Sequence, residues 1–154
     1  MNEHRRKFIQ GTGTAGALGV SLAAGLLPTR AFAAWNKGAF SATSVPAVEK
    51  ILGITGAVNS NQITINAPDI AEDARIVQIE VSSTLPNVQS IKLVVDKNPD
   101  PLAADFTLAN GMEPYVTTRI KMKETSMVRA FVTSGGRTYT AAKQVKVTIG
   151  GCGG

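Results

Sequence analysis

Apolar and polar residues alternate along much of the chain, and this period of two restricts the fold more than any other feature. Successive side chains of a β-strand point to opposite faces, so such a run predicts a strand with one buried face. Six runs alternate clearly: Ile63 and Ile65; Val77, Ile79 and Val81; Ile91, Leu93 and Val95; Val116, Thr118, Ile120 and Met122; Val128, Ala130 and Val132; Val145, Val147 and Ile149. Leu102 to Ala109 is a weaker seventh candidate.

Residues that favour turns separate these runs. They are Asn59-Ser60-Asn61, Pro86-Asn87, Asn98-Pro99-Asp100-Pro101, Asn110-Gly111 and Gly135-Gly136. Six or seven short strands spaced in this way are typical of an all-β fold. We predict an immunoglobulin-like antiparallel β-sandwich. The Cys-Trp-Cys core of antibody domains is absent, so the prediction depends on strand number and spacing.

One segment before the strands has the pattern of a helix. Ser44 can cap its start, Pro46 suits the first turn, and Gly53 can end it. We therefore expect a short N-terminal helix beside the sandwich, within a single domain of residues 34–149.

The first 33 residues have the layout of a bacterial export signal. A basic cluster at residues 5–7 precedes a weakly apolar stretch over residues 8–27, and residues 31–33 have the small-x-small form of a signal-peptidase site. The paired arginines resemble the twin-arginine signal. We expect residues 1–33 to be a twin-arginine-type signal peptide, cleaved after Ala33, with the remainder periplasmic and not membrane-bound. The alternative is an uncleaved membrane anchor, which the many Gly, Ser and Thr residues disfavour.

The leader also carries much of the positive charge. The whole chain has 16 Lys and Arg and 11 Asp and Glu; without residues 1–33 it has 12 and 10, a formal charge of +2. So small an excess gives no support to nucleic-acid binding. Alternating basic residues at Arg119, Lys121 and Lys123 predict a charged strip, which Arg129 on the next strand could join. Such a strip is usually a solvated face, and the alternative is a docking surface for an anion or an acidic partner.

Residues 34–154 contain no histidine and one cysteine, Cys152. A Ser-His-Asp triad, a Cys-His pair, a histidine or multi-cysteine zinc site and an internal disulfide are therefore excluded within this part of the chain. We accordingly expect no cofactor, no metal site and no catalytic residue.

Cys152 lies in an unusual setting, because Gly150, Gly151, Gly153 and Gly154 surround it. Glycine provides no side chain that could pack the thiol, so we expect residues 150–154 to be a flexible arm. Nothing adjacent lowers the thiol pKa, which makes Cys152 a poor nucleophile but an adequate handle for other enzymes. Three interpretations stay open at this point: a carrier site, an intermolecular disulfide tether to a partner, and a thiol without a role.

The export signal, the small β-sandwich and the terminal segment from Val145 to Gly154 resemble the SoxY family, the sulfur carriers of bacterial thiosulfate oxidation. The segment from Ala67 to Asp73 is also similar to the family's equivalent loop. The resemblance implies that Cys152 is the covalent attachment site for sulfur intermediates and that the four glycines form its swinging arm. It implies a carrier that is not itself an enzyme.

The resemblance also implies partners. These are a SoxZ-like subunit in a heterodimer, a c-type cytochrome that attaches thiosulfate to the thiol as an S-thiosulfonate, and a hydrolase that releases sulfate and leaves a persulfide. A sulfur dehydrogenase acts next in complete systems. Two fates of the persulfide stay open at this point: further oxidation and transfer to sulfur deposition.

Overall fold

The computed structural model describes residues 35–148. The expected signal peptide, residues 1–33, and the predicted arm, residues 150–154, lie outside this range. The described part contains two helices and nine strands. In chain order they are α3 (Lys37–Phe40), α4 (Val45–Leu52), β1 (Val58–Asn59), β2 (Ile63–Asn66), β3 (Ile70–Ala71), β4 (Val77–Ser83), β5 (Val88–Val95), β6 (Leu102–Thr107), β7 (Tyr115–Ile120), β8 (Ser126–Ser134) and β9 (Arg137–Val147).

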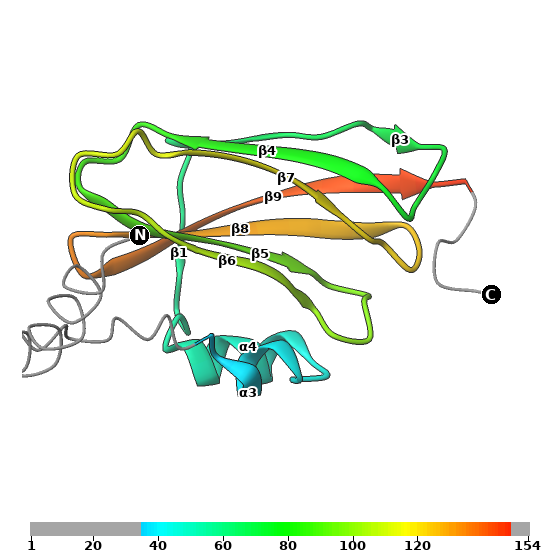
Figure 1. The fold of residues 1–154 in the computed structure, drawn as a ribbon, viewed down its shortest axis with the longest axis horizontal. Coiled ribbons are helices and arrows are strands. Elements are labelled where there is room, and N and C mark those ends of the chain that lie inside the picture. The colour runs from blue at the N-terminus through cyan, green and yellow to red at the C-terminus, as the bar shows by residue number, and fades with distance from the viewer. Residues whose placement is uncertain (1–34, 149–154) are drawn as a thin grey trace, which may run out of the picture. The chain divides into compact units, whose positions relative to one another are not determined.

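The strands form two facing sheets, as Figure 1 shows. The larger sheet has the order β1-β9-β8-β5-β6, with β3 also paired to β9, and the smaller has the order β2-β4-β7. All pairings among the seven predicted strands are antiparallel. The predicted all-β sandwich is confirmed. The two-residue strands β1 and β3 add short parallel pairings along β9, which the sequence did not predict.

The core lies between the two sheets because the apolar positions of each strand face inward. In β4, alternate residues Val77, Ile79 and Val81 are buried, and Ile91 and Leu93 of β5 lie opposite, fully buried. Each such side chain stabilises the fold by roughly 1.5–3 kcal/mol. The predicted period of two thus corresponds to the inner faces of the sandwich.

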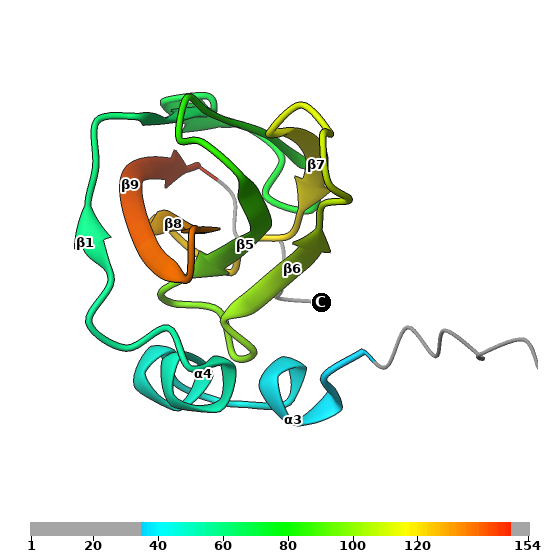
Figure 2. The same cartoon turned by 90° about the vertical axis from the view of Figure 1, so that its left-hand side faces the viewer.

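Both helices cover the outer face of the larger sheet, as Figures 1 and 2 show together. Val48 of α4 and Ala39 of α3 are completely buried and share a second apolar cluster with Val94 and Phe131. The predicted helix is confirmed as α4, with proline in its first turn and Gly53 ending it at φ 65°. Ser44 occupies the cap position, but its side chain makes no capping hydrogen bond.

A tight turn fixes the register of β8 and β9. Gly135 and Gly136 have φ angles of 55° and 78°, and Ser134 pairs directly with Arg137. Two consecutive residues with positive φ define the hairpin turn whose twist matches that of the strands, and glycine adopts this conformation without steric penalty. The turn therefore determines which residues of β9 reach the opposite end of the sandwich.

The prediction that Arg129 joins the basic strip is wrong. β7 belongs to the smaller sheet and pairs with β4, whereas β8 lies in the larger sheet between β5 and β9. Val128 and Ala130 face the core, so Arg129 points outward on the helix-bearing side, where its Nε and Nη2 donate to Asp96 at 2.7 and 2.8 Å. This bidentate pair raises the pKa of Arg129, chiefly through the hydrogen bonds from its guanidinium. Strands adjacent in sequence lie here in different sheets.

No helix within residues 35–148 is long and apolar enough to cross a membrane.

Candidate functional site

The candidate site is the point where β9 ends, because the predicted attachment site follows it closely in the chain. Thr148 is the last described residue, and Cys152 comes four residues later. At roughly 3.3–3.6 Å per residue, the Cys152 backbone can lie at most about 14 Å from Thr148. We call the residues around Thr148 the arm base: β3 and the loop that joins it to β4, the turn between β7 and β8, and the end of β9. The arm base therefore limits where the thiol can be presented. Cys152 and the glycines at 150, 151, 153 and 154 are themselves outside the described residues.

The loop that precedes β4 holds one side of the arm base. β3 pairs in parallel with the end of β9, with Ile70 opposite Lys146 and Ala71 opposite Val147. The Lys146 N–H donates to the Asp69 carbonyl at 2.9 Å, and the Thr148 N–H donates to the Ala71 carbonyl at 3.2 Å. The backbone is thereby fixed up to the last described residue. The segment Ala67 to Asp73, which the sequence associated with the resemblance, contains this anchor.

The turn between β7 and β8 holds the other side. The Thr125 hydroxyl accepts a hydrogen bond from the Val147 N–H at 2.9 Å. Asn98 then fastens this turn, since its side chain donates to the Lys121 carbonyl at 2.8 Å and accepts from the Lys123 N–H at 2.9 Å. The sequence assigned Asn98 only to a turn.

A further backbone bond joins the two sides. The Met122 N–H donates to the Ala74 carbonyl at 2.8 Å, and both residues are completely buried. Three loops that are distant in sequence are therefore tied together around the end of β9. These bonds hold the end of β9 in one position relative to the three loops.

Two ion pairs order the loop from Ala67 to Ile76. Lys143 of β9 lies 3.1 Å from Asp69 and donates to the Ala67 carbonyl at 2.6 Å. Arg75 makes two side-chain hydrogen bonds to Asp73, at 3.1 and 3.0 Å, and its N–H also donates to Asp73. These bonds lower the pKa of Asp73 below its usual 3.8, the Arg75 side chain contributing most. Asp69 and Asp73 of this loop thus each bind a neighbouring cation.

Three exposed lysines of the arm base have no such partner. Lys121, Lys123 and Lys146 form no ion pair with any residue of the described range, 35–148. Arg75, Lys97 and Lys143 at the same end are each paired with a carboxylate. The predicted strand ends earlier than expected, because β7 stops at Ile120 and Lys121 and Lys123 lie in the turn that follows it. Arg119, Lys121 and Lys123 are all exposed, and Lys146 is a fourth exposed cation close to Thr148 in the chain.

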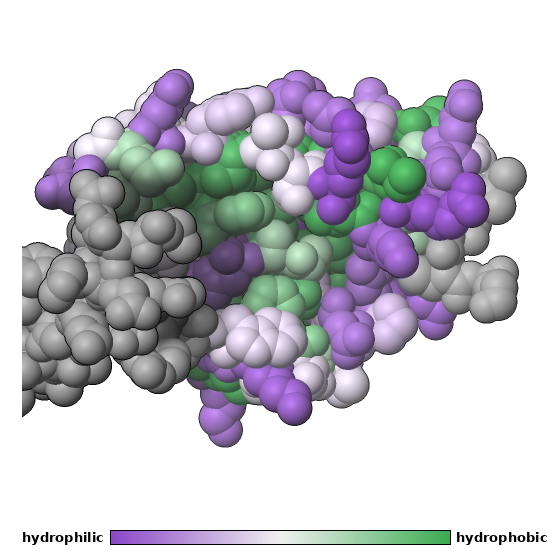
Figure 3. Space-filling model, in the orientation of Figure 1, coloured by the Kyte–Doolittle hydropathy of each residue, from purple (hydrophilic) through white to green (hydrophobic). Residues whose placement is uncertain are grey.

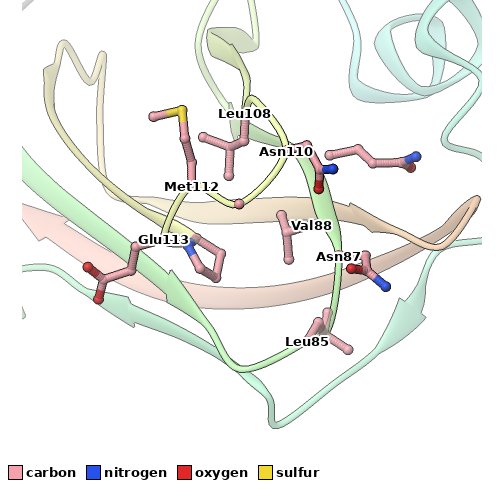
Figure 4. Close-up of a pocket in the computed structure, with 10 residues that line it drawn as sticks. Leu85, Asn87, Val88, Leu108, Asn110, Met112 and Glu113 are labelled. Atoms are coloured by element: carbon pink, nitrogen blue, oxygen red, sulfur yellow. The ribbon is translucent and has the colours of Figure 1, made fainter.

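A cavity in the described part of the chain lies elsewhere. It measures about 530 Å³ and lies between the β4–β5 turn and the β6–β7 loop, with Leu85, Val88, Leu108 and Met112 in its wall, as Figure 4 shows. This is the end of the sandwich where β9 begins, roughly 30 Å along that strand from its end. Cys152, at most about 18 Å beyond Val147, cannot reach it.

No group of three or more His, Cys, Asp and Glu side chains in residues 35–148 is arranged to hold a metal ion. The pattern that remains is a small β-sandwich in which three loops anchor the last strand directly before a cysteine. These features define a class: a small β-sandwich whose last described strand is fixed at its end, five residues before a cysteine in the sequence.

Comparison with known proteins gives the family. The model of the family described as "Sulfur oxidation protein SoxY" matches residues 48–152, which is most of the chain and ends at Cys152. The chain belongs to the SoxY family. It is accordingly a sulfur carrier protein of sulfur oxidation, as the resemblance predicted. No curated protein matches the chain.

A solved structure agrees with this assignment. The chain is similar to the sulfur carrier protein SoxY from Chlorobium limicola f thiosulfatophilum, with 33% identity, a TM-score of 0.57, and coverage of 66% of this chain and 94% of that one. It also matches a superoxide reductase (neelaredoxin) from Ignicoccus hospitalis at 20% identity and a TM-score of 0.49, covering 56% of this chain and 80% of that one. The second likeness carries no argument about function.

Proposed function

We propose that this protein carries sulfur intermediates covalently on Cys152 during periplasmic thiosulfate oxidation, and that other enzymes perform each chemical step. The observation that carries the proposal is the family match, which extends to Cys152 itself. The anchored end of β9 supports it, because the chain leaves the sandwich only a few residues before the thiol.

In the loading step, the Cys152 thiol and thiosulfate form a disulfide-type bond. The thiol loses its proton, the two sulfur atoms lose two electrons in total, and a c-type cytochrome accepts those electrons. The product is a cysteine S-thiosulfonate. The carrier contributes only the thiol, which is consistent with the lack of histidine and of a second cysteine in residues 34–154.

The next step releases sulfate without net oxidation. A hydrolase directs water to the outer sulfur of the thiosulfonate, and the bond between the outer and inner sulfur breaks. The outer sulfur leaves as sulfate, and the electron pair stays on the inner sulfur as a persulfide on Cys152. A sulfur dehydrogenase then oxidises the persulfide, or another acceptor takes its sulfur.

Covalent attachment gives the pathway a physical advantage. A persulfide or thiosulfonate free in solution would diffuse away, whereas a tethered one is presented to each enzyme at the high effective concentration that a short linker provides. Because all enzymes must reach the same thiol, the flanking glycines at 150, 151, 153 and 154 leave room for the adduct to enter an active site.

We further propose that residues 1–33 are a cleaved twin-arginine-type signal and that the mature protein is periplasmic, in a heterodimer with a SoxZ-like subunit. The Arg5-Arg6 pair and the site at Ala31-Phe32-Ala33 support export. Determining the N-terminal residue of the protein from its host tests this. Ala34 is the expected first residue, and a retained leader would contradict it.

In vitro loading tests the carrier proposal. The mature protein is incubated with thiosulfate and oxidised c-type cytochrome of its host, and its mass is recorded before and after reduction. We expect a thiosulfonate adduct that reductant removes, and none on the Cys152→Ser variant. If the protein purified from its host instead carries only a second protein chain bound through Cys152, it is a tethered interaction module.

A further inference from the structure

We propose that the surface around the arm base, comprising Ile70, Ile76, Lys121, Lys123 and Lys146, is the docking surface for the sulfate-releasing hydrolase that acts on Cys152. The matching surface of such an enzyme is apolar side chains and carboxylates around the mouth of its active site. This inference rests on the proposed function and deepens it, since it identifies the part of the sandwich that this hydrolase recognises.

The first argument is the length of the chain after the last anchored residue. The Cys152 backbone lies within about 14 Å of Thr148 whatever conformation the intervening residues adopt. The reacting atoms of any partner enzyme must come within that distance plus the length of the adduct. A folded enzyme that approaches so closely has to place its own surface against the residues around Thr148.

The second argument is that two apolar side chains of the loop that anchors β9 are exposed. Ile70 and Ile76 are 56% and 62% exposed, among the highest values for apolar residues in the described part. Their neighbours Ala71, Ala74 and Val77 are buried and already fill the core side of this loop. The two isoleucines therefore add little to the sandwich, and burying them against a partner would stabilise a complex.

The third argument is charge. Lys121, Lys123 and Lys146 lack ion-pair partners among residues 35–148, while the neighbouring Arg75, Lys97 and Lys143 have them. Figure 3 shows hydrophilic and hydrophobic residues side by side at the end of the sandwich where β4 begins and β7 ends. Uncompensated lysines around an apolar patch favour a partner with carboxylates at the corresponding positions, and they speed its approach.

The fourth argument is rigidity. Asn98, the Met122–Ala74 backbone bond and the β3–β9 pairing hold the loops of this surface in one arrangement before any partner binds. A surface already ordered loses little conformational entropy on binding.

The test separates docking from chemistry. Wild type and the Ile70→Ser/Ile76→Ser variant are first loaded without any enzyme, using tetrathionate: the Cys152 thiolate displaces thiosulfate from it and keeps a thiosulfonate. The sulfate-releasing hydrolase of the same host then acts on each loaded carrier, and kcat and KM for sulfate release are measured. Val58→Ser is the matched control, because Val58 is 49% exposed but pairs with Tyr139 near the start of β9.

We expect KM to rise roughly tenfold for the double variant with kcat unchanged, and neither value to change for Val58→Ser. A Lys121→Glu/Lys123→Glu variant should raise KM similarly, and added salt should bring its KM closer to that of wild type. The control variant Lys37→Glu/Lys50→Glu, on the helices, should leave KM unchanged. An unchanged KM in the isoleucine variant, or a loss of kcat alone, would overturn the docking surface.

The outcome for wild type separates this inference from the proposed function. If the hydrolase releases no sulfate even from loaded wild type, the carrier function fails. If the hydrolase releases sulfate from loaded wild type, and the double variant has the same KM as wild type, only the docking surface fails. Equal tetrathionate loading and circular dichroism in all variants show that the thiol and fold are intact.

Discussion

The backbone N–H of Val147 donates to the hydroxyl of Thr125 at 2.9 Å, which joins the end of β9 to a turn 22 residues earlier in the chain. With the parallel pairing to β3 on the other side, this bond fixes the strand end before Cys152.

Replacing Thr125 with valine keeps the shape of the side chain but leaves the Val147 N–H without its acceptor. We expect a loss of about 1 kcal/mol in the free energy of unfolding, because a partly buried donor is left unsatisfied. For a domain of this size that corresponds to roughly 4 °C in melting temperature. The Val147 amide should also exchange hydrogen faster. Thr117→Val is the control, since Thr117 is exposed on β7. Equal exchange in both variants would show that the bond does not hold the arm base.

The Asp73–Arg75 pair predicts a pH dependence. The hydrogen bonds from Arg75 lower the pKa of Asp73 in the folded protein, so the ionised form contributes stability above the usual value of 3.8. That contribution is lost as pH falls through the lowered pKa. The difference in melting temperature between wild type and Asp73→Asn should therefore be present at neutral pH and disappear in strong acid. It should be small, because the pair is exposed and screened by salt.

Asp100→Asn is the control for this prediction, because Asp100 is exposed and forms no ion pair within the described residues. Its melting temperature should follow that of wild type throughout the titration. A difference for Asp73→Asn that persists unchanged in strong acid would rule out the ion pair as its cause.

The β8–β9 turn predicts a strong dependence on residue type at Gly135. Its φ of 55° suits glycine or asparagine but strains a β-branched residue, although a Cβ added at this position would meet no atom within 4 Å. We expect Gly135→Val to be roughly 1–2 kcal/mol less stable than Gly135→Asn. Urea unfolding measures this. Equal stability of the two variants would mean that backbone strain does not govern the turn.

Bulky residues in the arm should affect enzymatic steps more than folding. We expect Gly151→Phe and Gly153→Phe to load normally with tetrathionate and to melt at the wild-type temperature. Their loading by thiosulfate and the cytochrome should be at least about tenfold slower, because the arm no longer fits the partner's active site. Intact-protein mass spectrometry over time follows both reactions. Wild-type rates with the cytochrome would argue against entry of the arm into a narrow site.

The sequence predicted the sandwich because its core strands carry the period of two over several residues, as in Val77, Ile79 and Val81. It predicted α4 from Pro46 and Gly53. It did not predict α3, β1 or β3, since a one-turn helix and strands of two residues have no measurable periodicity. β3 is nevertheless part of the anchor for β9.

The candidate site, like the fold, could be predicted only in part from the sequence. The family could be recognised from the residues around Cys152, because their composition is visible in the sequence. The arm base could not, since Asn98, Thr125 and Val147 meet only after strands from two sheets have paired. The placement of Arg129 failed for a related reason: alternation tells which residues share a face, but not which sheet a strand joins.

The most direct test of the central claim is the intact mass of the mature protein purified from cells growing on thiosulfate, measured with and without reductant and mapped to the C-terminal peptide. The account predicts adducts of one or more sulfur atoms, or a thiosulfonate, on Cys152 that reductant removes. A free thiol throughout growth, or Cys152 linked only to a second protein chain, would contradict the carrier function.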